Sequence, residues 1–154
     1  MNVPTVGFPE PYPDTMLTGE LEGGRPVWTL QVAFRFVAAD RYHGVVPAGF
    51  RFDFASVPRA FWRIFPPIHP RYAGAALLHD WVYASEWWDK VYCDRLFLGA
   101  MIGTGVSWWR RNAMWAAVAA FGGSTWRAHT RESVMGARRL SGVSTIRRPL
   151  YQMT

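Results

Sequence analysis

The sequence predicts an α+β protein, in which a small N-terminal antiparallel sheet packs against a C-terminal layer of about three helices. Between Pro26 and Val46, apolar side chains recur at every second position, which is the period of a strand with one buried face. From Tyr72 onward the chain becomes rich in Ala and Leu, which favour helices. Because the strands come first and the helices second, we expect the segregated α+β arrangement.

The alternation assigns the side chains of the first strands to two faces of the sheet. Residues such as Thr29 and Arg35 are expected to point away from the core, and the apolar residues between them to point into it. Gly23 and Gly24 predict a turn before these strands, and residues 39–44 predict a second turn. The expected core residues are Trp28, Leu30, Val32, Phe34 and Phe36.

The helix boundaries follow from capping residues and helix breakers. Ser56 is expected to cap a short helix, with Pro58 in its first turn, where the missing N–H costs nothing. Prolines at 66, 67 and 70 then interrupt the chain. Three longer helices are expected over Tyr72–Ala84, Asp89–Gly103 and Ser107–Phe121, the last one ended by Gly122 and Gly123.

The 154 residues are the length of one domain, and their composition divides them into three parts. Residues 1–15 carry four prolines and predict an extended arm, because proline removes a backbone donor and disfavours helix. Residues 16–130 predict a single α+β domain. Residues 131–154 are rich in small, polar and Arg residues, and we expect a basic tail that is loosely tethered.

Cysteine content and hydropathy restrict the class of protein. The single cysteine, Cys93, excludes an intramolecular disulfide and a multi-cysteine zinc site, and we expect it to be a small buried hydrophobe. Residues 1–30 lack the pattern of a signal peptide, and the apolar run from Ala113 to Phe121 is far short of the ~20 residues that span a bilayer. The sequence therefore predicts a cytoplasmic product and no transmembrane segment.

Basic side chains are concentrated in the last third of the chain. Residues 1–100 hold 9 basic and 10 acidic side chains, a net charge of −1, whereas residues 101–154 hold 8 arginines against Glu132 alone, a net charge of +7. Such a segment attracts anions, including nucleic acid, acidic protein surfaces and lipid headgroups. A solvated basic surface accounts for the same pattern equally well.

Three short stretches place ionisable side chains among apolar neighbours. They are Asp53–Arg59, His79–Tyr83, and Asp94 four residues after Lys90. A charged group in apolar surroundings costs free energy unless it is paired or bound to a metal. We therefore expect these residues to have a defined structural or chemical role.

The same stretches resemble a family known as domain of unknown function 1353. The resemblance covers roughly residues 25–123, and its Asp-Phe-Ala-Ser-Val-Pro-Arg string is specific. The sequence departs from the family pattern at Phe52, where Thr is usual, at Lys90 in place of Arg, and at Cys93 in place of Ala. The resemblance implies an origin in tailed phages or prophages and implies no particular activity. The matching residues are Gly49, Asp53–Arg59, Ala75–Asp80, Tyr83, Asp94 and Phe121–Gly122.

A structural interpretation of these residues is a fixed polar network. Asp53 would brace the turn into the Ser56 helix and accept a hydrogen bond from Arg59. His79 and Asp80 would be satisfied inside the helical layer, by the side chains of Tyr83 and Lys90.

A second interpretation is a metal-assisted hydrolase. Adjacent His and Asp on a helix are typical of one large group of phosphohydrolases, and a divalent metal would be the cofactor. The candidate ligands are His79, Asp80 and Asp94, with Asp53 as a further oxygen donor and His43 as the earlier histidine that such enzymes need.

A third interpretation is nucleophilic catalysis by Ser56 with His79 and an aspartate. The residue types suit a triad. No nucleophile elbow or oxyanion loop surrounds Ser56, however, and Val57-Pro58 favour a helix cap instead.

The basic third interleaves aromatic and guanidinium groups at residues 108–111 and 126–127, a combination that contacts nucleic acid or lipid headgroups. Trp108 and Trp115 are seven residues apart on one helical face, so we expect both to pack in the core. The arginines expected to bind an anionic partner are Arg110, Arg111, Arg138, Arg139, Arg147 and Arg148.

These observations favour a structural or assembly-associated virion protein of the phage tail or baseplate region. Its extended arm and basic tail would hold other phage structural proteins, and the excess of tryptophan suits an interface. The alternatives are the metal-dependent hydrolase, acting on cell-wall material or a phosphoester, and a host-directed or anti-defence binding protein.

Overall fold

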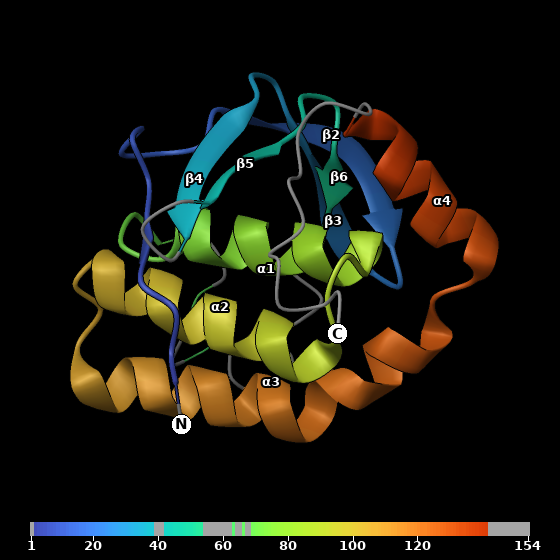
Figure 1. Ribbon diagram of the computed structural model, residues 1–154. Helices are drawn as coiled ribbons and strands as arrows, with labels where there is room; N and C mark the ends of the chain where they lie inside the picture. The colour runs from blue at the N-terminus through green and yellow to red at the C-terminus, as the bar shows by residue number, and fades with distance from the viewer. Residues whose placement is uncertain (1, 39–41, 54–62, 64–65, 67–68, 142–154) are drawn as a thin grey trace.

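The computed structural model describes residues 2–38, 42–53, 63, 66 and 69–141, and it has the predicted α+β arrangement (Figure 1). Within these residues, six antiparallel strands form two three-stranded sheets, with the strand orders β1-β4-β5 and β2-β3-β6. The strands are β1 Val6–Gly7, β2 Thr15–Glu22, β3 Arg25–Leu30, β4 Phe34–Ala38, β5 Tyr42–Val46 and β6 Arg51–Phe52.

A two-residue hairpin joins β2 to β3. Gly23 and Gly24 both have positive φ angles, 55° and 73°, as a type I′ turn requires, and Glu22 pairs with Arg25 across it. Leu30, like the two core phenylalanines predicted on β4, is buried. Val32 is 61% exposed instead, because residues 31–33 leave the ladder between β3 and β4.

Four helices follow in the described part of the chain: α1 Ala73–Ser85, α2 Lys90–Gly103, α3 Trp108–Ala128 and α4 Arg131–Leu140. The first three begin within a residue of the predicted positions. The Asp89 side chain caps α2 by accepting a hydrogen bond from the backbone N–H of Tyr92 at 2.9 Å. The prediction that Gly122 and Gly123 end α3 was wrong, because both remain helical.

The expected loose tail was wrong for residues 131–140, which form α4. Thr130 and Ser133 cap its first turn reciprocally. Val134 and Ala137 lie three residues apart on one face, and both are buried where α4 packs on α1. Residues 142–154, the rest of the predicted tail, lie outside the described residues.

Helix α1 lies between the strands on one side and α2 on the other (Figure 1). It is buried almost all round, and the exposed fraction of Leu77, Leu78, Trp81 and Val82 is 0%. Each such side chain contributes about 1.5–3 kcal/mol on burial. Helix α1 is therefore the buried centre of the fold.

The N-terminal segment is extended, as predicted, and it packs against its own chain. Val6 is buried and pairs with β4, and the Phe8 ring stacks on Phe34 with 5.0 Å between centroids. The segment then crosses α2 at two glycines one turn apart. A Cβ atom at Gly99 would lie 2.0 Å from the carbonyl oxygen of Pro4, and one at Gly103 would lie 2.0 Å from that of Val6.

Two sequence predictions about single residues had different outcomes. Cys93 is a buried free thiol, as expected. Trp115 packs partly buried against the core, but Trp108 is 71% exposed, so its predicted core position was wrong. Trp108 is the first residue of α3, where the helix has not yet reached its packing partners.

None of the helices in the described residues is both long and apolar enough to cross a membrane.

The close approach of the N-terminal segment to α2 can be tested with Gly99→Ala. We expect a loss of about 1–3 kcal/mol in the free energy of unfolding, because the added methyl group overlaps a backbone carbonyl. Denaturant unfolding measures this. Gly136→Ala is the matched control, because α4 has open space there, and alanine favours a helix by up to ~1 kcal/mol. Equal effects of the two substitutions would contradict the packing described.

Candidate functional site

Four side chains from α1 and α2 meet around one buried carboxylate. Helix α1 presents His79 and Tyr83 one turn apart, and α2 presents Lys90 and Asp94 one turn apart. Asp94 Oδ1 lies 3.1 Å from His79 Nε2 and accepts a hydrogen bond from the Tyr83 hydroxyl at 2.5 Å. His79, Tyr83 and Asp94 are all at most 4% exposed.

Lys90 connects this cluster to α3. Its Nζ donates to Asp94 Oδ2 at 2.8 Å and to the backbone carbonyl oxygens of Val118, at 3.2 Å, and Ala119, at 3.3 Å. A lysine ammonium has three donors, so these contacts use all of them. The family pattern has Arg here, and the compact ammonium suits three acceptors that converge on one point.

Gly122 provides room for the cluster on the α3 side. A Cβ atom at this position would lie 2.7 Å from the Tyr83 hydroxyl oxygen and 3.5 Å from Lys90 Cε. A helical glycine usually costs up to ~1 kcal/mol relative to alanine. Its presence at a buried position of α3 is explained by the space that the Tyr83 hydroxyl needs.

The surroundings fix the protonation states of the cluster. Burial lowers the pKa of His79 below its usual value, although the hydrogen bond to Asp94 opposes this. Burial acts to raise the pKa of Asp94, but the hydrogen bonds from His79, Lys90 and Tyr83 outweigh it and lower that pKa. Burial, then the contact with Asp94, raises the pKa of Tyr83. His79 is therefore neutral at pH 7 and donates its Nε2–H to an ionised Asp94.

Among the described residues, the second ring nitrogen of His79 has no hydrogen-bond partner. Nδ1 is buried, and the ring packs between Tyr83, at 4.1 Å between centroids, and Phe97, at 4.8 Å. In the neutral tautomer that Asp94 selects, Nδ1 carries the free lone pair. The arrangement leaves a basic nitrogen, held in orientation by a carboxylate, with unused accepting capacity.

Asp80 faces a different side of α1 from His79 and lines a pocket of about 120 Å³. Asp53, at the end of β6, and His129, just after α3, line the same pocket. Asp53 lies 3.5 Å from the Arg25 guanidinium, and His129 Nδ1 lies 3.0 Å from a Glu86 carboxylate oxygen. The structure thus brings Asp53 and Asp80 to one pocket beside the buried cluster.

The structure separates the predicted metal ligands into two groups. His79 and Asp94 bond to each other, and Asp80 faces the pocket with Asp53. Among the described residues, no three His, Cys, Asp or Glu side chains are grouped so as to hold a metal ion. Ser56 and Arg59 lie outside the described residues, as does the side chain of His43. Catalysis by Ser56 stays a prediction.

The basic residues predicted to bind a partner differ in their surroundings. The Arg138 guanidinium donates to the carbonyl oxygens of Ser85 and Glu86, both at 2.7 Å, and lies over the Trp87 ring. Arg138 therefore joins α4 to the end of α1. Arg139 is exposed.

At the start of α3, Arg110 lies over the Trp109 ring, with 5.2 Å to the centroid, and Arg111 donates to the carbonyl oxygen of Val106 at 3.3 Å. Arg147 and Arg148 lie outside the described residues. Binding of a partner by these arginines stays a prediction.

Sequence reasoning missed His129, Thr125 and Gly122 as neighbours of the site. They lie on or just after the second half of α3, which had been expected to end before them. Their approach depends on how α3 packs, so no local spacing reveals it. The signal that was available is Gly122 itself, because a glycine inside a helix usually has a packing reason.

Comparison with known proteins shows which family the chain belongs to. Residues 28–118, more than half of it, match the model of a family described as protein of unknown function (DUF1353). The chain belongs to this family. The matched DUF1353 region contains the whole His79–Asp94 cluster and ends before Gly122 and His129.

One curated relative is similar to this DUF1353 chain, the uncharacterized protein y4jT of Sinorhizobium fredii (strain NBRC 101917 / NGR234). The two are 32% identical over 108 residues, which are 70% of this chain and 32% of the relative. The chain therefore spans about a third of the length of that relative. No solved structure matches the chain significantly.

The buried carboxylate can be tested with Asp94→Asn. The substitution leaves Lys90 without a counter-charge and offers an N–H where the cluster needs an acceptor, so we expect a loss of about 3–5 kcal/mol in the free energy of unfolding. Urea unfolding measures it. Glu22→Gln, an exposed acid on β2, is the control and should change stability by no more than ~0.5 kcal/mol. A small effect at Asp94 would mean that the cluster does not hold the helices together.

The lowered pKa of His79 predicts the pH dependence of stability. The folded protein resists protonation of His79, whereas the unfolded chain takes up that proton near pH 6.5. This contribution is therefore fully present above about pH 6.5 and is lost as the pH falls below it. Unfolding measured between pH 8 and pH 5 should show the decline, and His79→Asn should show a shallower one. An unchanged slope in the variant would contradict a neutral buried His79.

Proposed function

We propose that this protein is a hydrolase of carboxylic esters, in which His79 is the general base that activates water. The observation that carries the proposal is the free Nδ1 of a buried histidine whose other nitrogen is fixed by Asp94. General bases are oriented in this way in hydrolases, by a carboxylate that selects the tautomer and stabilises the imidazolium. Tyr83 holds the carboxylate from the other side.

The proposed reaction transfers one proton. Nδ1 takes a proton from water as the water oxygen attacks the ester carbonyl carbon, and the C=O bond becomes a tetrahedral oxyanion. The oxyanion then collapses, the bond to the alcohol oxygen breaks, and the leaving alkoxide takes the proton from His79. The single base supplies the one proton that the alkoxide leaving group of an ester takes up.

Water is the proposed nucleophile because no described side chain near His79 is suited to be one. Within the described residues, neither a serine nor a cysteine hydrogen-bonds to His79. Cys93 lies next to Asp94 in sequence, but burial raises the pKa of its thiol, and its Sγ faces the carbonyl oxygens of Val82 and Trp88. A thiol in such surroundings stays protonated and is a poor nucleophile.

A divalent cation at Asp80 is a separate part of this proposal, because Asp80 faces a different side of α1 from His79. The Asp80 carboxylate shares its pocket with Asp53, and hard cations such as Ca²⁺ and Mg²⁺ prefer carboxylate and carbonyl oxygens. A cation there would bind an oxygen atom of a ligand in this pocket. In this proposal, His79 is the base and the Asp94 carboxylate orients it. Of the three residues first considered as metal ligands, only Asp80 would bind a metal ion.

The proposal is tested with p-nitrophenyl esters as substrates, with added CaCl₂ or MgCl₂ and with EDTA. His79→Asn should lower kcat/KM by about 10²–10⁴-fold, the usual contribution of a general base. Because the pKa of His79 is lowered, the wild-type rate should stay high down to pH 6.5 and fall only below it. Asp80→Asn should abolish the dependence on the cation.

Gly99→Ala serves as the control for this experiment, since it is expected to destabilise the fold at a place away from His79. It should keep kcat/KM near the wild-type value under conditions where it stays folded. Ester hydrolysis that survives in His79→Asn, or that is absent from the wild type with every cation tried, would rule out the proposed reaction.

A second candidate function is a structural role in a phage virion, with neighbouring subunits as partners. The supporting observation is the exposed tryptophan pair at the start of α3, with Trp108 71% and Trp109 52% exposed, next to Arg110. Val6 and Phe8 of the N-terminal segment pack within the chain, and the proposed contact surface is this end of α3. Mass spectrometry of purified virions should then detect the protein in stoichiometric amount, and its absence would exclude this role.

A further inference from the structure

Helix α3 has an exposed face that is apolar along most of its length. The helix packs on α2 and has no comparably extensive contact with another helix or strand of the described chain, so it is the outermost helical layer (Figure 1). No charged residue occurs between Arg111 and Arg127. The solvent side of a surface helix is usually charged or polar, so this composition needs an explanation. The exposed residues of α3 between positions 112 and 125 are Ala113, Ala116, Ala119, Ala120, Phe121 and Ser124.

Large aromatic side chains lie on the same exposed surface. Trp108 is 71% exposed, Trp109 is 52% exposed and Phe121 is 59% exposed. Trp109 begins a row that continues through Ala113 and Ala116 at a helical spacing of three to four residues. Single exposed hydrophobic residues are common on proteins, whereas a contiguous set marks an interaction surface.

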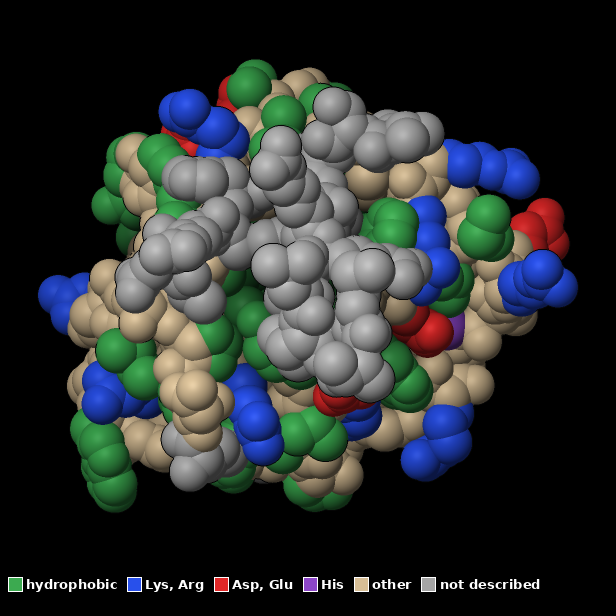
Figure 2. Space-filling model, in the orientation of Figure 1, with side chains coloured by type: hydrophobic (Ala, Val, Ile, Leu, Met, Phe, Trp, Pro, Cys, Tyr) green, Lys and Arg blue, Asp and Glu red, His purple; other side chains and the backbone are tan. Residues whose placement is uncertain are grey.

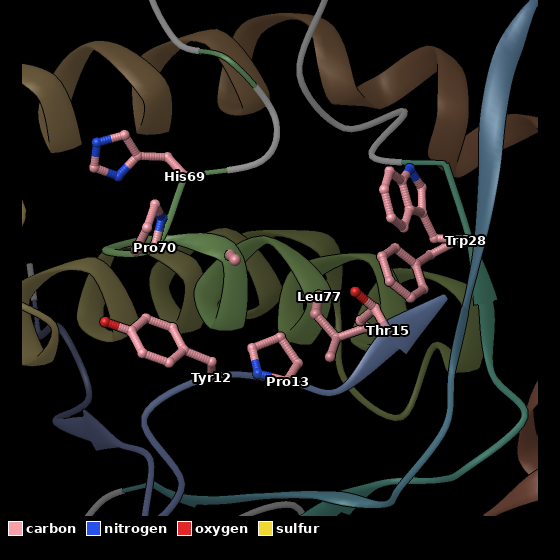
Figure 3. Close-up of a pocket in the computed structure, with 9 residues that line it drawn as sticks. Tyr12, Pro13, Thr15, Trp28, His69, Pro70 and Leu77 are labelled. Atoms are coloured by element: carbon pink, nitrogen blue, oxygen red, sulfur yellow. The ribbon is translucent and has the colours of Figure 1, made fainter. Parts of the chain in front are cut away.

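The apolar pocket beside α1 shows the contrast. Its volume is about 190 Å³, and its walls come from four separate parts of the chain. Figure 3 shows Tyr12 and Pro13 on one side, Trp28 on another, and Leu77 of α1 between them. These side chains surround a common space, whereas the aromatic side chains of α3 face solvent.

The charged side chains on and beside this face in the sequence are all basic. Arg110 lies over the Trp109 ring, with 5.2 Å to the centroid, and Arg127 and Arg131 follow at the other end of the helix. All three arginines are exposed, and residues 101–131 contain no acid. Figure 2 shows hydrophobic and basic side chains along the lower edge of the molecule, where Figure 1 places α3.

This distribution of charge favours an anionic partner over a second copy of the chain. If two α3 helices packed antiparallel on this face, Arg110 of one copy would lie near Arg127 of the other, and like charges in contact oppose association. An anionic surface would instead be attracted at both ends of the helix.

We propose that α3 docks on an anionic lipid bilayer and lies in the plane of its surface. The row that begins at Trp109 would face the acyl chains, and Arg110 and Arg127 would lie among the lipid phosphates. Tryptophan prefers the boundary between headgroups and acyl chains, and interfacial helices combine such rings with arginine. An outermost helix can meet a flat surface along its whole length. The inference goes beyond the proposed ester hydrolysis and does not depend on it.

The experiment measures sedimentation of the protein with vesicles. Vesicles of equimolar phosphatidylglycerol and phosphatidylcholine should carry the protein down, and vesicles of phosphatidylcholine alone should bind it much more weakly. Added NaCl should weaken binding to the anionic vesicles, because salt screens the attraction of the arginines to the phosphates. Equal binding to both kinds of vesicle, or binding to neither, would overturn the proposal.

Substitutions locate the contact on α3. The double variant Trp108→Ser/Trp109→Ser should weaken binding to the anionic vesicles at least tenfold. Arg110→Gln and Arg127→Gln should each weaken it about fivefold, the usual contribution of one arginine near an anionic surface.

Matched controls make the same changes away from α3. Leu21→Ser removes a side chain of β2 that is 72% exposed, and Arg35→Gln removes a charge from β4. Both variants should bind like the wild type once circular dichroism shows that they are folded. Losses as large as those of the α3 variants would refute the location.

Two further measurements test the other occupants of this face. A fluorescent single-stranded oligonucleotide tests for nucleic acid, and analytical ultracentrifugation tests for self-association. Oligonucleotide binding without vesicle binding would overturn the lipid assignment. So would a dimer that Trp109→Ser dissociates, because a second copy would then cover the face.

Discussion

The carboxylate of Asp94 is the interaction on which the arrangement of the helices depends. It lies between α1 and α2, accepts from side chains on both, and through Lys90 reaches the backbone of α3. An ionised carboxylate in such a position is stable only when donors surround it, because its desolvation costs several kcal/mol. Three donors from two helices meet that requirement, and each has a fixed direction. The carboxylate therefore selects one relative position of α1 and α2, and the apolar side chains around it can pack in only one way. Gly122 shows the same constraint from the α3 side, since its missing side chain leaves room for the Tyr83 hydroxyl.

Much of the fold could be predicted from local patterns, and the exceptions have physical causes. The alternation before residue 38 and the Ala- and Leu-rich composition from Tyr72 onward are local signals, and they indicated the fold class and the first three helices. Gly122 was interpreted as a helix stop because a glycine doublet usually is one. The space that Tyr83 needs is a tertiary property and is invisible in the sequence. Helix α4 was missed for a related reason. Its arginines suggested a solvated tail, but the Arg138 guanidinium satisfies carbonyl groups at the end of α1, where Glu86 takes a positive φ of 44° and the helix stops.

The sequence identified the residues of the candidate site, but it did not reveal which of them contact one another. The unusual placement of His79, Asp80 and Asp94 among apolar residues was enough to select them, since buried ionisable groups need a partner. Adjacent residues on a helix point about 100° apart, however, so His79 and Asp80 face different surroundings. One turns toward α2 and its carboxylate, and the other toward a pocket shared with Asp53. Sequence proximity had suggested one metal-binding group, whereas the helix geometry divides it into a buried pair and a separate pocket wall. The partnership of Asp94 with Tyr83 also depends on the packing of α1 against α2.

A purely structural role for the cluster leaves one observation unexplained. A buried histidine nitrogen without a partner costs about 1–3 kcal/mol, and an apolar side chain of similar volume at position 79 would avoid that cost. Tyr83 and Lys90 could hold Asp94 between the helices without any histidine, since they already occupy both of its oxygens. The imidazole is a third donor to a carboxylate that these two side chains already contact. What it adds is a neutral base with a defined tautomer, whose lone pair is not used by the protein. The lone pair of Nδ1 is the feature on which the proposed role of His79 as a base rests.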